Sequence, residues 1–286
     1  MTRARSRRGR GPGSWPGGRP PALERFSQNF LVDPNTARKI VDAAGVGAGD
    51  SVLEIGPGHG ALTQLLAPRV ALLRVVEIDR ALAWALAERY ADEPRVEVIA
   101  GDALAIGLDA LLAEGGHWSV VANLPYRITT PILFALLDAR ARLASATVMV
   151  QREVAERVEA SPGSKEWGTL SVHCQRLADV RVLFDVPPTV FRPRPAVHSA
   201  VLRLDFLARP RVDVGDEEHF RRVVRAAFGQ RRKTLRNALK SGAWSPDAID
   251  AAGRAAALDL TRRGETLDLV ELAALARALP DVSPNA

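Results

Sequence analysis

Val52-Leu53-Glu54-Ile55-Gly56-Pro57-Gly58-His59-Gly60 is the most informative stretch of the sequence. Its apolar first half is typical of a buried β-strand, and the glycines let the backbone turn sharply before a helix that begins near Ala61. The glycine spacing is G-x-G-x-G, whereas the G-x-G-x-x-G spacing aims a helix N-terminus at a pyrophosphate. The sequence therefore predicts a turn that approaches a ligand closely, and that ligand need not carry a phosphate.

Two acidic residues follow near the ends of the next two apolar runs. Glu77 lies 21 residues after Gly56, and Asp102 follows the run Val96–Ala100. A carboxylate at the first position can accept hydrogen bonds from both hydroxyls of a ribose, and the second can accept one from an adenine amino group. A glycine turn followed by an acid also occurs in NAD-binding dehydrogenases. The spacing and Asp102 favour a methyltransferase over that alternative.

The motif Asn123-Leu124-Pro125-Tyr126 follows another apolar run, Ser119–Ala122. The exocyclic amine of adenine is a poor nucleophile, because its lone pair is delocalised into the ring. The Asn123 side-chain oxygen and the Leu124 carbonyl oxygen can accept its two N–H groups and direct its lone pair at a sulfonium methyl group. Pro125 stiffens the turn, and Tyr126 offers a flat face to an extruded base. The alternative is an ordinary Asx-Pro turn, but beside the glycine turn and the two acids the motif predicts methyl transfer to adenine.

Short apolar runs alternate with helical patterns between residues 23 and 207, which predicts a doubly wound, mainly parallel sheet. With the motifs above, we expect the Rossmann-like α/β fold of class I S-adenosylmethionine-dependent methyltransferases, with seven strands. The later part of the chain is helical in character. The predicted division is a disordered basic tail over 1–22, a catalytic domain over 23–207 and a helical domain over 208–286. The expected strands are Ser51–Ile55, Ala71–Ile78, Val96–Ala100, Ser119–Ala122, Ala146–Gln151, Val180–Phe184 and Ser199–Phe206.

Composition excludes several classes of protein. Apolar residues make up 47% of the chain, enough for a substantial core, yet no apolar run approaches the roughly 18 residues that span a bilayer. We therefore expect no membrane partner. The single cysteine, Cys174, and 5 scattered histidines predict no metal site and a reducing, cytoplasmic setting. A monomer is the default expectation.

Positive charge gathers in two places. The first 20 residues hold six arginines and no acid, which equals the net charge of +6. Between His219 and Lys240 there are eight basic residues and no acidic ones, whereas an ordinary solvated surface mixes both signs. This second segment predicts contact with RNA, with Arg232, Arg236 and Lys240 on one face of a helix. The candidate RNA-binding residues are Arg222, Arg225, Arg232, Lys233 and Arg236.

Taken together, these motifs resemble the rRNA adenine N6-dimethyltransferase family over roughly residues 23–280. Phe26–Leu31 is similar to the N-terminal motif of that family, which implies that Asn29 and Leu31 cover the methionine part of S-adenosylmethionine. The resemblance further implies that the residues holding this cofactor include Gly56, Gly58, Glu77, Asp102 and Asn123.

The family has two main bacterial branches. One dimethylates two adjacent adenosines in the 3′-terminal hairpin of 16S rRNA in the immature small ribosomal subunit, and the other methylates 23S rRNA and confers macrolide resistance. Ser27 and the Arg-rich tail are reminiscent of the second branch, so that alternative stays open. The segments that resemble the 16S branch are longer: Gln151–Arg157, Pro162–Val172, Val186–Pro188, Phe191–Pro195 and Arg231–Asn237.

Overall fold

The computed structural model describes residues 29–112 and 117–281. The predicted basic tail over 1–22 and the first part of the Phe26–Leu31 motif lie outside the described residues.

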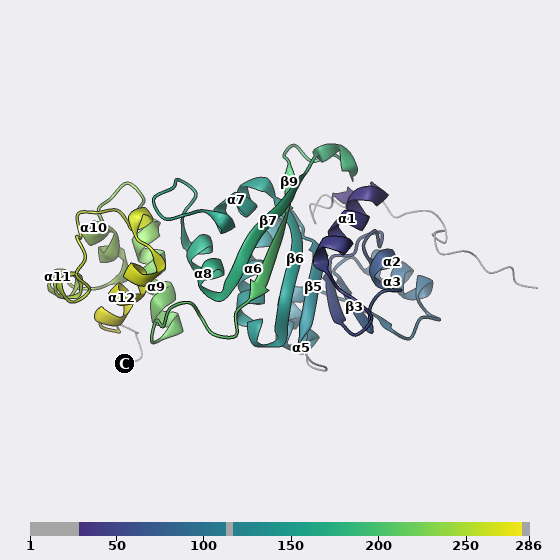
Figure 1. Ribbon diagram of the computed structural model, residues 1–286, viewed down its shortest axis with the longest axis horizontal. Coiled ribbons are helices and arrows are strands. Elements are labelled where there is room, and N and C mark those ends of the chain that lie inside the picture. Colours follow the sequence, from purple (N-terminus) through teal and green to yellow (C-terminus); the bar gives the residue numbers. More distant parts are fainter. Residues whose placement is uncertain (1–28, 113–116, 282–286) are drawn as a thin grey trace, which may run out of the picture. The chain divides into compact units, whose positions relative to one another are not determined.

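The described residues form a seven-stranded sheet in which the strands lie side by side (Figure 1). The pairs β2–β3, β3–β4, β2–β5 and β5–β6 are parallel. Most of β2 and β5 is buried, as expected for parallel strands covered on both faces. The strand order is β4 (Val96–Ala100), β3 (Leu72–Glu77), β2 (Ser51–Ile55), β5 (Trp118–Asn123), β6 (Leu143–Gln151), β9 (Ser199–Phe206) and β7 (Ala178–Val186).

The order in which the chain adds strands to the sheet reverses at β2. It adds β3 and β4 on one side of β2, and then places β5 on the other side. In open α/β sheets, ligands bind at such a switch point, outside the carboxyl ends of the strands. The glycine turn follows β2 and Asn123 ends β5, so the topology brings these two motifs to adjacent positions. The predicted fold class and its seven strands are confirmed.

Local chemistry sets the helix ends in this part of the chain. The carboxylate of Asp33 accepts a hydrogen bond from the Thr36 N–H at the start of α1, and Gly45 ends that helix in the left-handed conformation (φ 64°). Asp79 caps α3 in the same way, by accepting from the Ala81 N–H. The helices are α1 (Pro34–Ala44), α2 (Thr63–Leu66), α3 (Arg80–Arg89), α4 (Ala103–Ile106), α5 (Leu108–Leu111), α6 (Thr129–Asp138) and the 3₁₀ turns η2 (Tyr126–Ile128), η3 (Arg140–Arg142) and η4 (Pro188–Val190).

A small antiparallel ribbon was not predicted from the sequence. Strand β1 (Phe30–Leu31) pairs with β8 (Phe191–Arg192), and the Val32 N–H donates to the Val190 carbonyl oxygen at 2.8 Å. This ribbon fixes the N-terminal motif to a distant part of the chain, and thereby fixes the position of Asn29.

The described part of the chain divides into two compact units. The first comprises residues up to Val150 together with Phe184–Val201, and the second comprises Gln151–Leu183 and Leu202 onward. Residues Gln151–Leu183 thus cluster with the C-terminal helices, although the sequence boundary expected at 207/208 assigned them to the catalytic domain. Trp167 explains this clustering, because its side chain is buried in the apolar core of the second unit. The functional division at 207/208 stays a prediction.

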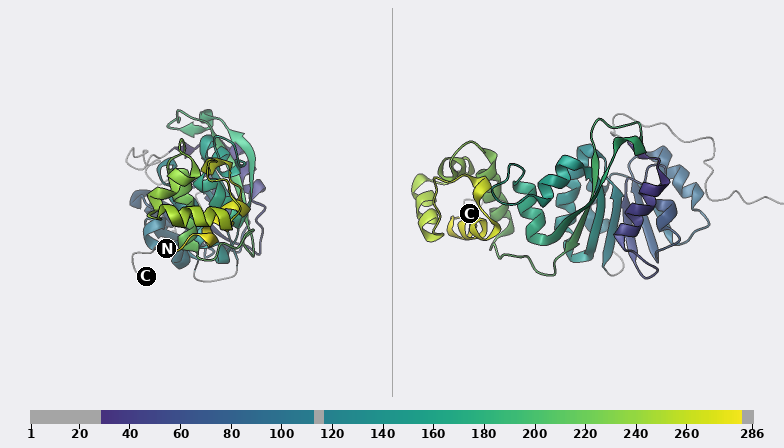
Figure 2. Two further views of the ribbon diagram at one scale, coloured as in Figure 1. Left: turned by 90° about the vertical axis from the view of Figure 1, so that its left-hand side faces the viewer. Right: turned by 45° about the horizontal axis from the view of Figure 1, so that its top comes forward.

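The second unit is built mainly of helices. Figures 1 and 2 show α9, α10, α11 and α12, drawn in green to yellow, packed around one another. Phe220, Val224, Ala227 and Phe228 of α9 are buried, which confirms the apolar stripe predicted for that segment. The helices of the unit are α7 (Arg152–Glu159), α8 (Thr169–Leu177), α9 (Glu217–Gly229), α10 (Leu235–Leu239), α11 (Pro246–Ala255), α12 (Leu269–Ala278) and the turns η5 (Lys240–Gly242) and η6 (Gly264–Thr266).

One sequence prediction in this unit is wrong. Arg232, Arg236 and Lys240 do not share a face of one helix, because α10 spans only Leu235–Leu239. The Lys233 N–H closes a turn on the Gln230 carbonyl oxygen, and Thr234 is extended (ψ 155°), so Arg232 precedes the helix. Four-residue spacing of charges is compatible with a helix, but it does not show where the backbone stops being helical.

Gly264 provides a test of the packing in the second unit. A Cβ at this position would lie 2.3 Å from the Ala227 carbonyl oxygen, so Gly264→Ala should force backbone apart and lower the free energy of unfolding by more than about 2 kcal/mol. At Gly229 a Cβ would meet no described atom within 4 Å, so Gly229→Ala should change stability by less than about 1 kcal/mol. Chemical denaturation of both variants measures the difference. Equal stability of the two variants would contradict the close approach of Gly264 to α9.

Candidate functional site

A cavity of about 480 Å³ lies at the carboxyl ends of the parallel strands. Its volume is in the range of pockets that hold small organic ligands. The residues predicted from the glycine turn, the two acids, the N-terminal motif and the Asn-Leu-Pro-Tyr motif all line this one cavity: Asn29, Leu31, Gly56, Gly58, Glu77, Asp102, Asn123, Leu124, Pro125 and Tyr126.

The glycine turn adopts a backbone that only glycine tolerates well. Gly56 and Gly58 have positive φ angles of 68° and 56°. A Cβ on Gly58 would lie 2.9 Å from the Phe30 ring, and the same ring packs against His59 in a tilted arrangement with 4.0 Å between centroids. Phe30 therefore lies directly against the turn. Sequence reasoning gave it no role, although it lies within the motif that supplied Asn29 and Leu31.

Glu77 is buried beneath the turn, with only 3% of its surface exposed. One carboxylate oxygen accepts the Gly58 N–H and the other accepts the Asp79 N–H, each at 3.0 Å. Burial raises the pKa of Glu77, while these two N–H groups oppose the rise by stabilising the charged form. Because each carboxylate oxygen can accept more than one hydrogen bond, Glu77 can also receive hydroxyl donors from a ligand.

Asp102 follows β4 and caps the short helix α4. Its Oδ1 accepts the Leu104 N–H at 2.9 Å, and the adjacent Gly101 N–H donates to the Glu77 carbonyl oxygen at 2.9 Å. The ends of β3 and β4 are thereby joined. No described residue donates to Asp102 Oδ2, so this oxygen can accept a hydrogen bond from a ligand in the cavity.

Asn123 is oriented by the N-terminal segment. Its Nδ2 donates to the Asn29 carbonyl oxygen at 3.1 Å, and since a carbonyl can only accept, this contact fixes which end of the amide is which. The Leu124 N–H donates to the Met149 carbonyl oxygen at 3.1 Å. Among the described residues, nothing donates to Asn123 Oδ1 or to the Leu124 carbonyl oxygen. The motif thus offers two acceptors at the cavity.

The remainder of the motif is held in place by its neighbours. The Tyr126 hydroxyl forms a 2.8 Å hydrogen bond with Ser199 Oγ, and burial raises the pKa of the tyrosine. The Pro125 ring lies against Gly56, 3.6 Å from the place where a Cβ would stand. The sequence did not indicate a role for Ser199, because it lies 73 positions after Tyr126.

Glu54 lies in the wall of the same cavity and is almost fully buried. Its carboxyl group accepts a hydrogen bond from the Thr63 hydroxyl at 2.7 Å. Burial raises the pKa of Glu54 to about 8, and the nearby Glu77 carboxylate adds to the rise. At neutral pH the protonated form of Glu54 is therefore favoured.

The predicted RNA-binding residues all lie in the second unit, and their ion pairs differ. Arg236 forms a bidentate pair with Asp250, with both distances 2.7 Å, and Arg222 pairs with Asp281. Arg225, Arg232 and Lys233 are exposed and form no ion pair with another described residue. The five cations therefore differ in how readily they can form an ion pair with a new anionic partner.

This fold and site together define a class. The mainly parallel sheet, with its switch point beside β2, is the Rossmann-like fold of S-adenosylmethionine-dependent methyltransferases. The glycine turn, spaced for a ligand without a pyrophosphate, and the acids at the ends of the next two strands agree with this class. The family model described as ribosomal RNA adenine dimethylase matches residues 22–274. The chain belongs to this family, which confirms the resemblance seen in the sequence.

Individual relatives agree with that assignment. The chain is 52% identical to ribosomal RNA small subunit methyltransferase A of Moorella thermoacetica, over 88% of this chain and 90% of the relative. The protein of the same name from Geobacter metallireducens is 48% identical, over 90% and 95%.

Solved structures share the fold. A dimethyladenosine transferase from Plasmodium falciparum has a TM-score of 0.73 at 24% identity, covering 86% of this chain and 95% of the other. The 23S rRNA methyltransferase ErmE has a TM-score of 0.66 at 27% identity, covering 88% of this chain and 99% of the other.

Within the described residues, no helix is both long and apolar enough to cross a membrane.

The buried Glu54 carboxyl group should make stability depend on pH. In the unfolded chain its pKa is near 4.5, so between about pH 4.5 and 8 the folded protein binds the proton more tightly, and its stability falls as pH rises through that interval. Glu54→Gln lacks this equilibrium. Its free energy of unfolding relative to the wild type should therefore increase by roughly 3–5 kcal/mol between about pH 5 and pH 9.

Urea denaturation across that pH range measures this difference. Glu88→Gln is the matched control, because Glu88 is exposed on α3 and its substitution should give a difference that stays nearly constant with pH. A constant difference for Glu54→Gln as well would show that Glu54 is ionised throughout, contrary to the buried site described here.

Proposed function

We propose that the protein uses S-adenosylmethionine to dimethylate N6 of two adjacent adenosines in the 3′-terminal hairpin of 16S rRNA, during maturation of the small ribosomal subunit. The observation that carries the proposal is the pair of acceptors, Asn123 Oδ1 and the Leu124 carbonyl oxygen, beside a cavity that fits the cofactor. The names of the relatives at 48–52% identity support the 16S target. The proposal includes a cytoplasmic location, where these subunits mature, and action as a monomer.

The residues of the cavity fit the cofactor. The buried Glu77 carboxylate would receive the ribose hydroxyls, Asp102 the adenine amino group, and Asn29 and Leu31 would cover the methionine part. Gly56 and Gly58 have no Cβ, so they tolerate positive φ angles and their backbone can lie close to the ligand. When bound, S-adenosylmethionine supplies a methyl group on a positively charged sulfur.

The Asn-Leu-Pro-Tyr motif then prepares the nucleophile. The two N–H groups of the adenine amine donate to Asn123 Oδ1 and to the Leu124 carbonyl oxygen, which favours a pyramidal nitrogen whose lone pair lies outside the ring plane. The nitrogen takes the methyl group from the sulfur as the sulfur–methyl bond breaks, and only then releases one proton to water, so no strong base is needed. A monomethylated amine retains one N–H, and one of the two acceptors can still hold it for the second transfer. Tyr126, fixed through Ser199, supplies a face on which the base can stack.

The second unit supplies the proposed RNA contacts. Arg225, Arg232 and Lys233 are exposed and suited to phosphate groups, whereas Arg222 and Arg236 would have to exchange an existing ion pair. Double-helical RNA is recognised largely by its shape and its backbone, which such a surface can contact without reading sequence. We propose that residues 23–207 catalyse the reaction and that residues 208–286 bind the RNA.

Methylation of 23S rRNA is the second candidate, because the fold also matches ErmE. Mass spectrometry of rRNA fragments from a strain lacking the gene distinguishes the targets. Loss of N6,N6-dimethyladenosine from the 3′ end of 16S rRNA, restored by the wild-type gene, is the expected result. Loss from 23S rRNA alone would replace the proposal with the second candidate, and no loss from either would refute both.

Substitutions of Asn123 and Glu77 should affect catalysis and cofactor binding separately. Asn123→Ala removes one acceptor for the amine and should lower kcat by about 10²–10³-fold with little change in the Kd for the cofactor. Glu77→Ala removes the proposed ribose acceptor and should raise that Kd by about tenfold or more. Single-turnover methylation and isothermal titration with S-adenosylhomocysteine measure the two quantities. If Asn123→Ala weakened cofactor binding as much as turnover, the role assigned to its side-chain oxygen would be wrong.

A further inference from the structure

Phe30 connects two parts of the cavity. Its ring packs against the glycine turn that follows β2, and the residue before it supplies the carbonyl that orients the Asn123 amide. The proposed function assigns the turn to the cofactor and the amide to the adenine amine. Phe30 therefore lies where the groups that would hold the methyl donor meet those that would hold the nucleophile.

The Phe30 ring is tightly packed on the glycine turn. Its centroid is 4.0 Å from that of the His59 ring, with 44° between the two planes. It also takes the space beside Gly58, where a Cβ would stand 2.9 and 3.1 Å from two of its carbons. Gly58 is itself held by Glu77, whose carboxylate accepts its N–H at 3.0 Å. Phe30 is 9% exposed, so this packing leaves the ring little freedom to move.

The backbone around Phe30 is held by the β1–β8 ribbon. Phe30 is paired with Arg192, and the Val32 N–H donates to the Val190 carbonyl oxygen at 2.8 Å. Isolated two-stranded ribbons are marginally stable in water, and here each strand has only two residues. Apolar packing must therefore stabilise this ribbon, and the Phe30 ring supplies its contact with the glycine turn.

The place of this segment determines which end of the Asn123 amide faces the cavity. Asn123 Nδ2 donates to the Asn29 carbonyl oxygen at 3.1 Å. If the amide turned over, Oδ1 would face that carbonyl, and two acceptors would meet without a hydrogen between them. An N–H group, instead of an oxygen, would then face the adenine amine, which is itself a donor. The Asn29 carbonyl thus selects the orientation in which Asn123 can accept from the amine.

Phe30 also lines the cavity, and a residue that only covers the cofactor would have a different effect. Loss of a cover weakens cofactor binding and leaves the rate at saturating cofactor unchanged. Loss of a positioning residue lowers that rate, because the acceptor for the amine is no longer held in place. Within residues 29–112 and 117–281, the Asn123 amide donates to the Asn29 carbonyl alone, so the second effect is expected.

We infer that Phe30 is a positioning residue for methyl transfer, which acts through the Asn29 carbonyl on the orientation of the Asn123 amide. It rests on the proposed function, because that function makes Asn123 Oδ1 an acceptor for the adenine amine. Packing of an apolar ring on the cofactor turn thereby sets the geometry of the group that receives the substrate.

The first test needs no methylation. In the nitrogen–proton NMR spectrum of the full chain, the Asn123 side-chain amide is identified by its loss in Asn123→Ala. Its proton bonded to the Asn29 carbonyl should exchange with water more slowly than those of exposed asparagines. In Phe30→Ala this exchange should become about five to ten times faster, as expected for the loss of one hydrogen bond. Phe30→Leu, which keeps an apolar side chain in β1, serves the same purpose if Phe30→Ala does not fold.

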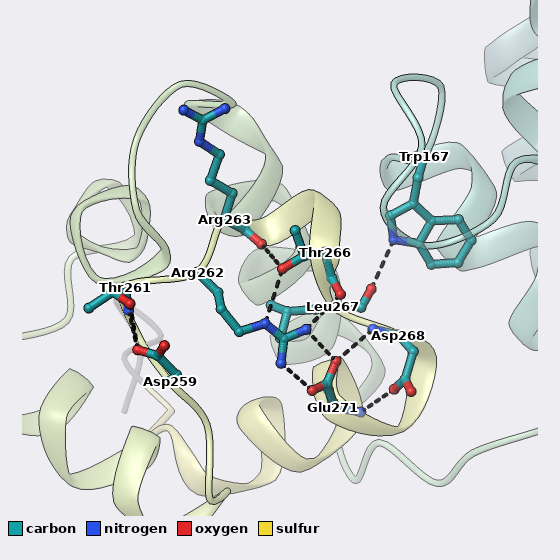
Figure 3. Close-up of polar contacts among 9 residues, drawn as sticks. All are labelled: Trp167, Asp259, Thr261, Arg262, Arg263, Thr266, Leu267, Asp268 and Glu271. Atoms are coloured by element: carbon teal, nitrogen blue, oxygen red, sulfur yellow. Dashed lines mark hydrogen bonds and ion pairs between the residues drawn. The ribbon is translucent and has the colours of Figure 1, made fainter.

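Two variants control for lost packing elsewhere. Phe184→Ala removes a ring of the same unit, which lies 3.8 Å from the Lys39 ammonium group of α1. Trp167→Phe removes the hydrogen bond from Nε1 to the Leu267 carbonyl oxygen in the second unit, shown in Figure 3. Both should lower the melting temperature and leave the exchange of the Asn123 amide unchanged. Unchanged exchange in Phe30→Ala, or an equal increase in either control, would overturn the inference.

A double-mutant cycle tests whether the effect passes through Asn123. With saturating cofactor and small subunits from a strain lacking the gene, Phe30→Ala should lower the single-turnover rate about five- to tenfold. In the Asn123→Ala background the same change should alter the rate by less than about twofold, because the group that it orients is already absent. Equal decreases in both backgrounds would overturn the inference, as would a raised Kd for S-adenosylhomocysteine with an unchanged rate.

The two tests also separate this inference from the proposed function. Methylation by the wild type, combined with unchanged amide exchange in Phe30→Ala, would refute the role of Phe30 alone. Faster exchange in Phe30→Ala, combined with no methylation of either rRNA by the wild type, would refute the proposed function, while Phe30 would still orient the Asn123 amide.

Discussion

The buried carboxylate of Glu77 is the constraint on which the site depends. It ends β3 and accepts the Gly58 and Asp79 N–H groups, so one side chain holds both the glycine turn after β2 and the start of α3. Burying a carboxylate is costly unless it is hydrogen-bonded, and these two backbone donors offset that cost while leaving acceptor capacity for a ligand. The same residue thus shapes the turn and faces the cavity, which explains why an acid is needed at this position.

Much of this arrangement could be predicted from the sequence. The strands Ser51–Ile55, Val96–Ala100 and Ser199–Phe206 have the predicted bounds, because each is an apolar run bordered by turn residues. Strand topology then places the glycine turn and Asn123 side by side, so residues on separate motifs reach one cavity. The candidate residues were identified by chemistry at strand ends, where an α/β fold gathers its functional groups.

Long-range contacts could not be predicted. The β1–β8 ribbon has two-residue strands, too short for any periodic pattern, yet it positions the Asn29 carbonyl that orients Asn123. The Arg236–Asp250 pair joins adjacent elements of the second unit, and Thr234 ends the helical pattern that the charges suggested. Sequence spacing indicates which residues are charged. The tertiary structure determines which of those charges remain accessible, as the contrast between the exposed Arg232 and the paired Arg236 shows.

A crystal structure of the full chain with S-adenosylhomocysteine tests the central claim most directly. The account predicts that the ribose hydroxyls bond to the Glu77 carboxylate, that the adenine amino group reaches Asp102, and that the amino-acid part lies beneath Asn29 with its sulfur toward Asn123. A ligand bound in a cavity that Asn123 does not face, or a glycine turn that holds a dinucleotide diphosphate in its place, would contradict it.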